Sequence, residues 1–151
     1  MRIQVSILFA ALVGLIIAGG CTPPGPVDEA VKEALNNVLQ TEEFTQQERD
    51  AVQSIKVHNE EAKVWLKSGF STDQQTVTAV AEHVGKVLAK TFYQTAMSKG
   101  YMEDKYNIEV WMRASDSKGP FNALVAEWAW NIQTDRTVGN NYGTSRTREI
   151  R

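Results

Sequence analysis

The spacing of hydrophobic positions changes several times along this chain, and each change predicts a new element. From Val27 to about Gln40, apolar residues recur every three or four positions, and Asp28 and Glu29 lie in the first turn, where negative charge suits the helix dipole. This pattern predicts an amphipathic helix. The polar segment 41–50 contains a single Phe and fits either an extension of this helix or a short turn.

Two alternating runs follow, at residues 52–57 and 62–67, on either side of the polar sequence HNEE. In the second run, successive side chains point to opposite faces, because a strand has a period of two. The two sets are Ala62, Val64 and Leu66 on one face, and Lys63, Trp65 and Lys67 on the other. The segment is predicted to be a β-hairpin.

A long helix is expected from about Asp73 to Ser98, because valines, alanines and Leu88 recur at helical spacing. Ser71 or Thr72 is predicted to cap it, since each has a Gln three residues later, which is the capping-box spacing. Gly100 is the expected stop.

Apolar and polar residues alternate again in the last third of the chain. Residues 108–113 predict a third strand, with Ile108, Val110 and Met112 on one face and Glu109, Trp111 and Arg113 on the other, and the turn SDSKGP follows. Residues 121–132 fit either a helix or a strand. We predict a strand, because a hairpin turn precedes it and Trp128 and Trp130 stand at alternate positions, facing inward.

The predicted order is α-β-β-α-β-β, which gives an α+β fold in two layers. We expect a mostly antiparallel four-stranded sheet with the long helix packed on one face. The first helix then either covers the other face or packs beside the long helix. This single domain is expected to span residues 27–135, followed by a polar, flexible tail at 136–151 that is rich in Gly, Asn, Thr and Arg.

Chain length and net charge limit the number of domains and the classes of partner. A chain of 151 residues is about the size of one domain, and its formal net charge is −2. Nucleic acid is not an expected partner, since binding a duplex depends on a clustered basic face.

The first twenty residues predict a signal peptide. Arg2 supplies a positive start, residues 3–18 are mostly apolar, and the small residues Ala18, Gly19 and Gly20 lead to Cys21. The apolar run is short for a membrane-spanning helix, which needs about 20 such residues. An ordinary signal peptide that leaves Cys21 as a free thiol is the alternative.

The sequence LIIAGGC at 15–21 resembles the lipobox of bacterial lipoproteins. The resemblance covers residues 1–21 only and implies removal of residues 1–20 after lipid is attached to Cys21. It departs from the usual pattern in having Ala18 where Leu is more typical. Residues 21–26 would then form a lipidated Cys and a short Pro-rich spacer. In lipoproteins of diderm bacteria, Asp directly after the cysteine is typical of retention in the inner membrane. Thr22 stands there instead, so the resemblance implies an outer-membrane protein that faces the periplasm.

Catalytic and metal-binding patterns are not found in the sequence. His58 and His83 have no ligand spacing, and neither a G-x-S-x-G motif nor a phosphate loop is present, so we expect no enzyme, no metal and no cofactor. His58 with Glu60 and Glu61 could hold a cation weakly, although a solvated turn is the more usual case. His83 is expected at the edge of the core.

The remaining candidate is a binding face. Trp65 and Trp111 alternate with charged residues and could share the sheet face away from the long helix, together with Lys63, Lys67 and Arg113. Burial of both rings under the first helix is the more usual outcome, since helices commonly cover sheets. The expected function is to bind or help assemble another envelope component, a protein or a glycan. The alternatives are a small envelope hydrolase or transferase, and an inhibitor of a cell-wall hydrolase that presents SDSKGP or HNEE.

Overall fold

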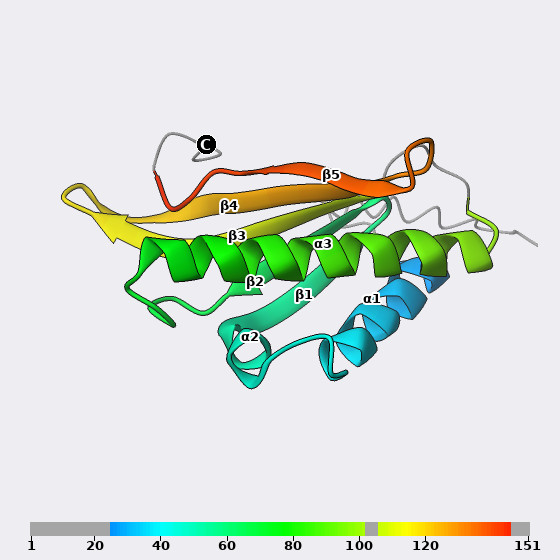
Figure 1. Ribbon diagram of the computed structural model, residues 1–151, viewed down its shortest axis with the longest axis horizontal. Helices are drawn as coiled ribbons and strands as arrows, with labels where there is room; N and C mark the ends of the chain where they lie inside the picture. The colour runs from blue at the N-terminus through cyan, green and yellow to red at the C-terminus, as the bar shows by residue number, and fades with distance from the viewer. Residues whose placement is uncertain (1–24, 102–105, 146–151) are drawn as a thin grey trace, which may run out of the picture.

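A five-stranded mixed sheet organises the domain, and the strands lie in the order β1-β2-β3-β4-β5 (Figure 1). The computed structural model describes residues 25–101 and 106–145. The strands are β1 (Val52–His58), β2 (Glu61–Leu66), β3 (Asn107–Asp116), β4 (Gly119–Asn131) and β5 (Arg136–Asn141). The helices are α1 (Pro26–Leu39), α2 (Gln46–Ala51) and α3 (Gln74–Ser98). The predicted α+β class is confirmed, whereas the prediction of four strands is wrong.

The pairing of β2 with β3 is parallel, and the other three pairings are antiparallel. Val64 stands beside Val110 in the parallel pair, and Trp65 stands beside Trp111. Parallel neighbours cannot be joined by a tight turn, so the chain needs a crossover, and α3 provides it. The β1–β2 hairpin and the β3–β4–β5 meander are thereby joined into one sheet.

The described helices pack on one face of the sheet (Figure 1). The long helix α3 contacts β3, β4 and β5, and α1 packs against α3 and β1. The buried side chains between them form one cluster, which includes Leu35 of α1, Val64 of β2 and Leu88 of α3. Of the two predicted positions for the first helix, the structure has the second, in which it packs beside the long helix.

Asp28 fixes the start of α1 to the sheet. Its carboxylate is buried and accepts hydrogen bonds from the backbone N–H of Gly25 at 2.9 Å and of Asn59 at 3.0 Å. Asn59 lies in the β1–β2 turn, where its φ of 54° is in the left-handed region that Asn tolerates. One side chain therefore satisfies two amides that belong to segments far apart in the sequence.

The segment between α1 and β1 contains a turn and a separate short helix. Phe44 is buried in the turn, and Thr45 caps α2 by accepting a hydrogen bond from the N–H of Glu48. Glu48 completes the capping box, because its carboxylate accepts from the N–H of Thr45 at 2.7 Å. The segment therefore does not extend the first helix.

The cap of α3 differs from the prediction. Asp73, and neither Ser71 nor Thr72, is the N-cap, and its carboxylate accepts from the N–H of Gln75 and Thr76. Two carboxylate oxygens can accept from two helix amides at once, which a single hydroxyl does less well. The helix ends before Gly100 as expected, where φ is 82°.

Residues 119–131 form a strand, as predicted, and a further strand lies where a flexible tail was expected. That expectation is wrong for residues 136–141, which form β5 against β4. Its side chains are mostly exposed and polar, so it carries no alternating hydrophobic signal. Gly139 allows the close pairing, because a Cβ there would lie 2.0 Å from the carbonyl oxygen of Glu127.

Gly85 brings α3 close to the sheet. A Cβ at this position would lie 2.4 Å from Cδ1 of Trp128, whose ring is buried on the helix side. Trp130 also faces α3, where it stacks on Tyr93 at 6.4 Å between ring centroids. Both tryptophans of β4 therefore point inward, as the sequence predicted.

We expect Gly85→Ala to destabilise the protein even though it improves helix propensity. Replacing Gly by Ala inside a helix favours the helix by about 1 kcal/mol, whereas overpacking a dense core costs about 1–3 kcal/mol. Urea unfolding of the wild type and the variant measures the net effect. In a Trp128→Ala background the clash is absent, so Gly85→Ala should there raise the free energy of unfolding. An equal effect in both backgrounds would contradict the proposed contact.

Candidate functional site

The sheet face opposite the helices is the first candidate site. Within residues 25–101 and 106–145, no helix packs over it (Figure 1). We call it the open sheet face, and the strand register and alternation place these residues on it: Lys56, Lys63, Trp65, Glu109, Trp111, Arg113, Asn122, Leu124 and Glu127. Trp111 and Leu124 are buried but lie outside the main core cluster, which agrees with this position. The first helix therefore does not cover this face.

Two stacked tryptophans form the centre of the open sheet face. The rings of Trp65 and Trp111 are 5.9 Å apart between centroids and inclined by 28°. Trp111 is only 4% exposed, and its indole N–H donates to Glu109 at 2.8 Å. Trp65 remains partly exposed. Trp111 thus supports the stack, and Trp65 presents it to the surface.

Lys63 is held beside this stack by two carboxylates. Its Nζ lies 3.1 Å from Glu61 and 3.6 Å from Glu109, and 6.0 Å from the ring centroid of Trp111. The hydrogen bond to Glu61, which outweighs partial burial, raises the pKa of Lys63 above its ordinary value. Lys63 therefore stays charged and is already paired on this face.

The other two predicted cations are placed differently. Arg113 is exposed on β3 next to Asn122 of β4, two positions beyond Trp111. Lys67 is exposed just past the end of β2, where its backbone N–H donates to the carbonyl of Ala51 at 2.8 Å. The structure thus groups Trp65, Trp111 and Lys63 closely, with Arg113 on the same face and Lys67 at its margin.

The open sheet face continues toward β5 in a part that the sequence did not predict. Glu127 accepts hydrogen bonds from Asn107 at 2.9 Å and from the hydroxyl of Tyr142 at 3.2 Å. A groove of about 860 Å³ adjoins these residues and is bordered by Ile132 and Val138. Without the β5 pairing, nothing in the sequence places residues 138–142 beside Glu127.

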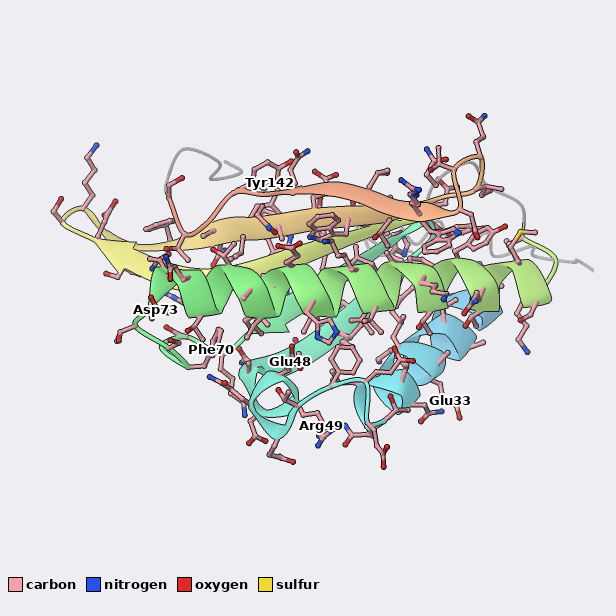
Figure 2. The ribbon with its side chains drawn as sticks, in the orientation of Figure 1. Glu33, Glu48, Arg49, Phe70, Asp73 and Tyr142 are labelled. Carbon is pink, nitrogen blue, oxygen red and sulfur yellow. The ribbon has the colours of Figure 1, made fainter. Side chains whose placement is uncertain are left out.

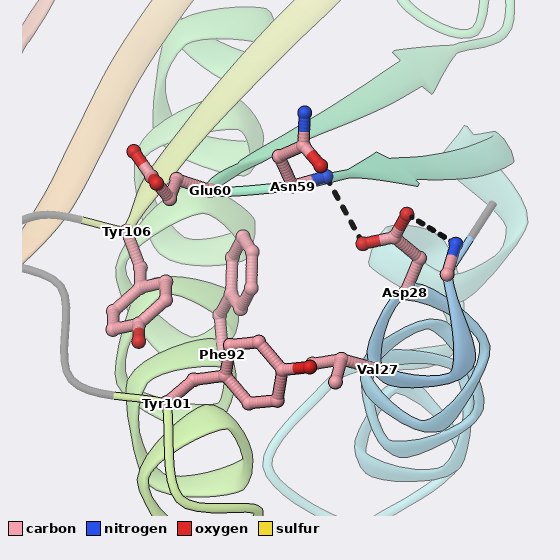
Figure 3. A pocket seen from close by; sticks show the side chains of 8 residues that line it. Val27, Asp28, Asn59, Glu60, Phe92, Tyr101 and Tyr106 are labelled. Carbon is pink, nitrogen blue, oxygen red and sulfur yellow. Dashed lines mark hydrogen bonds between the residues drawn. The ribbon is translucent and has the colours of Figure 1, made fainter. Parts of the chain in front are cut away.

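A pocket of about 320 Å³ lies at the end of the domain where α1 begins (Figure 3). Its lining includes Val27, Asp28, Phe92, Tyr101 and Tyr106. Each oxygen of Asp28 already accepts a backbone N–H, as the dashed lines in Figure 3 show. The pocket is therefore largely aromatic, and its carboxylate serves the fold.

The two histidines have separate carboxylate partners. Nδ1 of His83 lies 2.6 Å from Oε1 of Glu48, which is labelled in Figure 2. The His83 ring packs near Phe44, with 5.4 Å between the ring centroids. His58 is largely exposed, and its Nδ1 lies 3.8 Å from Asp28. In the part of the chain that the structure describes, no group of His, Cys, Asp and Glu side chains could hold a metal ion.

Glu48 connects α2 to α3 and has a shifted pKa. Burial raises the pKa of Glu48, but the hydrogen bonds from Thr45 and His83 together lower it below its ordinary value of 4.5. The ionised carboxylate is the form that these donors stabilise. The sequence placed His83 at the edge of the core but gave no sign of its partner, 35 residues away.

The predicted lipidation site, Cys21, lies outside the described residues. None of the helices in the described ranges has the length and apolar character needed to cross a membrane. The chain matches no family model, no curated protein and no solved structure.

We expect Glu48→Gln to lower the free energy of unfolding at pH 7 by about 1–2 kcal/mol, because a buried charge-assisted hydrogen bond is lost. The pKa of Glu48 is lowered in the folded state, so its contribution is present above pH 4.5 and is lost as pH falls through the folded-state value. The difference in the free energy of unfolding between the wild type and the variant should therefore become smaller over that acidic range. Urea unfolding from pH 7 to pH 3 measures it, with the exposed Glu42→Gln as control. A gap that does not change with pH would contradict this role.

Proposed function

We propose that this protein is a lipid-anchored component of a bacterial cell envelope, whose domain binds another envelope component through the open sheet face. The anchor would be lipid on Cys21, and the outer membrane, on its periplasmic side, is the proposed location. The proposal joins one feature of the N-terminal sequence to one feature of the folded domain.

The N-terminal sequence supports the anchor. An apolar run, three small residues and Cys21 follow one another in an order that resembles a lipobox, with Ala18 where Leu is more typical. Cys21 is also the single cysteine of the chain, so no internal disulfide can use it. Several acyl chains hold a protein on a membrane stably, whereas one chain is marginal.

The observation that carries the binding proposal is the stacked Trp65–Trp111 pair on a sheet face that the described helices leave uncovered. Aromatic rings and arginine are the residue types that dominate binding energy at protein interfaces. The indole of Trp111 is held by Glu109 and the rings support each other, so little side-chain entropy is left to lose on binding.

A protein partner fits this face better than a glycan does. Sugar stacking needs an exposed ring face, but Trp111 is only 4% exposed and each ring covers one side of the other. Charges of both signs surround the stack, with Arg113 and Lys56 exposed and Glu61 partly exposed. Such a mixed rim suits the polar edge of a protein–protein interface.

The β3–β4 hairpin favours a second candidate, inhibition of a cell-wall hydrolase. Its tip extends beyond the N-terminal end of α3 (Figure 1). The turn is ordered by a hydrogen bond from the N–H of Lys118 to Asp116 at 2.8 Å, and Gly119 takes a φ of 107°. A rigid protruding loop could enter the cleft of a target enzyme, which the flat open sheet face could not do.

Cys21→Ala tests the anchor. We expect the wild type to gain the mass of a lipid at Cys21 and to partition into detergent, because the acyl chains are transferred out of water. The variant should lack this mass and stay in the aqueous phase. Intact-mass measurement and detergent partitioning check both expectations. Unlipidated, soluble wild-type protein would contradict the anchor.

Site-specific photocrosslinking in cells tests which surface binds. A photoreactive residue in place of Lys56 or Asn122 reports on the open sheet face, one in place of Ser117 reports on the hairpin tip, and Gln94 on the exposed side of α3 is the control. We expect one shared adduct from positions 56 and 122, which Trp65→Ala weakens at least several-fold. An adduct confined to position 117 would favour the inhibitor, and equal labelling at position 94 would contradict a specific face.

A further inference from the structure

We propose that the end of the domain at which α1 begins rests against the membrane, and that Tyr101, Ile132 and Val138 enter the lipid headgroup region. This inference rests on the proposed function, because it needs the lipid on Cys21. It adds an orientation of the domain and a second, non-covalent contact with the membrane.

The short tether limits which surface can reach the lipid. Three residues separate Cys21 from Gly25, and the four steps from one Cα to the next span at most about 14 Å when extended. From Gly25 onward the chain is held, because its N–H is bonded to Asp28. The 13 residues of β4 span about 43 Å by comparison. Any surface that contacts the membrane must therefore include, or lie beside, the region around Gly25.

Several segments meet at this end (Figures 1 and 3). Gly25, Asn59 of the β1–β2 turn and Tyr101 at the end of α3 line one pocket. The N–H of Asn107 at the start of β3 donates to the carbonyl of Glu60 in the same turn, at 2.9 Å. Asn107 also borders the groove that contains Ile132 and Val138. The β4–β5 turn thus lies at the same end as the start of α1.

Exposed apolar side chains are concentrated at this end. Among the described residues, the large hydrophobic side chains classed as exposed are Tyr101 at 48%, Ile132 at 45% and Val138 at 46%. They come from three segments that are distant in the sequence, and all three border the pocket or the groove at this end. Tyrosine is enriched at membrane interfaces, where its ring meets the apolar layer and its hydroxyl stays hydrated.

A flat orientation, with α1 lying along the membrane, fits less well. The exposed side of α1 is polar along its length, with Glu29, Lys32, Glu33, Asn36 and Asn37. Inserting these side chains would remove charges from water without a partner. The end-on orientation instead buries apolar side chains and leaves the part of the open sheet face around Trp65 and Trp111 accessible.

The charges around this end have both signs. Lys99 and Arg136 are exposed, as are Glu60 and Asp135, and Glu61 is partly exposed. Recognition of anionic lipid depends on clustered Lys and Arg, and these residues form no such cluster. We therefore expect the contact to depend on the headgroup interface itself, with little dependence on lipid charge.

Fluorescent labelling of the full-length lipidated protein in vesicles tests the inference. Lipidation uses the thiol of Cys21, so a cysteine introduced by Ile132→Cys or Tyr101→Cys is the one site for a polarity-sensitive dye. Ser117→Cys, at the tip of the β3–β4 hairpin, is the matched control at the other end of the strands. Vesicles of phosphatidylcholine, with and without phosphatidylglycerol, carry a nitroxide quencher on the headgroup, and intact mass confirms lipid on Cys21.

We expect a blue shift and strong quenching of the dye at positions 132 and 101, with no shift or quenching at 117, in both kinds of vesicle. Lipidated protein whose dye at 132 and 101 stays in water would overturn the orientation while the anchor stands. Quenching that requires phosphatidylglycerol would overturn the apolar contact in favour of a charge effect. Absence of lipid on Cys21 would remove the anchor, and this inference with it.

Discussion

The parallel pairing of β2 with β3 is the constraint on which the rest of the architecture depends. Because both strands run in the same direction, the chain must return along the full length of the sheet before β3 can begin. The 25 residues of α3 rise about 37 Å, which is close to the length of the strands that it covers. The crossover helix is therefore also the main cover of one sheet face, and α1 fills the space left beside it, over β1.

As a result, one face of the sheet packs against the helices, and the described helices leave the other face uncovered. On the helix side, Gly85 and Trp128 bring helix and sheet into close contact, and Glu48 joins α2 to α3 through His83. On the open sheet face, the indole rings of Trp65 and Trp111 pack on each other in place of a covering helix. The surface proposed for binding is thus preorganised by the same strand register that builds the core.

Elements with a local signal could be predicted from the sequence, whereas features set by distant partners could not. The amphipathic pattern of α1, the alternation in β2 and the paired tryptophans of β4 gave the correct secondary structure. The polar strand β5 was missed because few of its side chains are buried. Its position depends on backbone hydrogen bonds to β4 and on the close approach that Gly139 allows. Alternation allowed Trp65 and Trp111 to lie on the face away from the long helix, but burial under the first helix was the more usual expectation. The burial of Trp111 instead accompanies the stack with Trp65 and the neighbouring Leu124, which alternation alone does not show.

The topology also bears on how the chain folds. The β1–β2 hairpin closes across two residues, whereas the parallel β2–β3 pair must close across about 40, which costs about 2–3 kcal/mol more in chain entropy. The hairpin and the β3–β4–β5 meander can form locally, so their docking through α3 is expected to set the folding rate. Substitutions along the β2–β3 seam would then slow folding, whereas those at the β3–β4 tip would mainly speed unfolding. If the chain is exported as proposed above, this late long-range step would delay the formation of the sheet while the chain crosses the membrane.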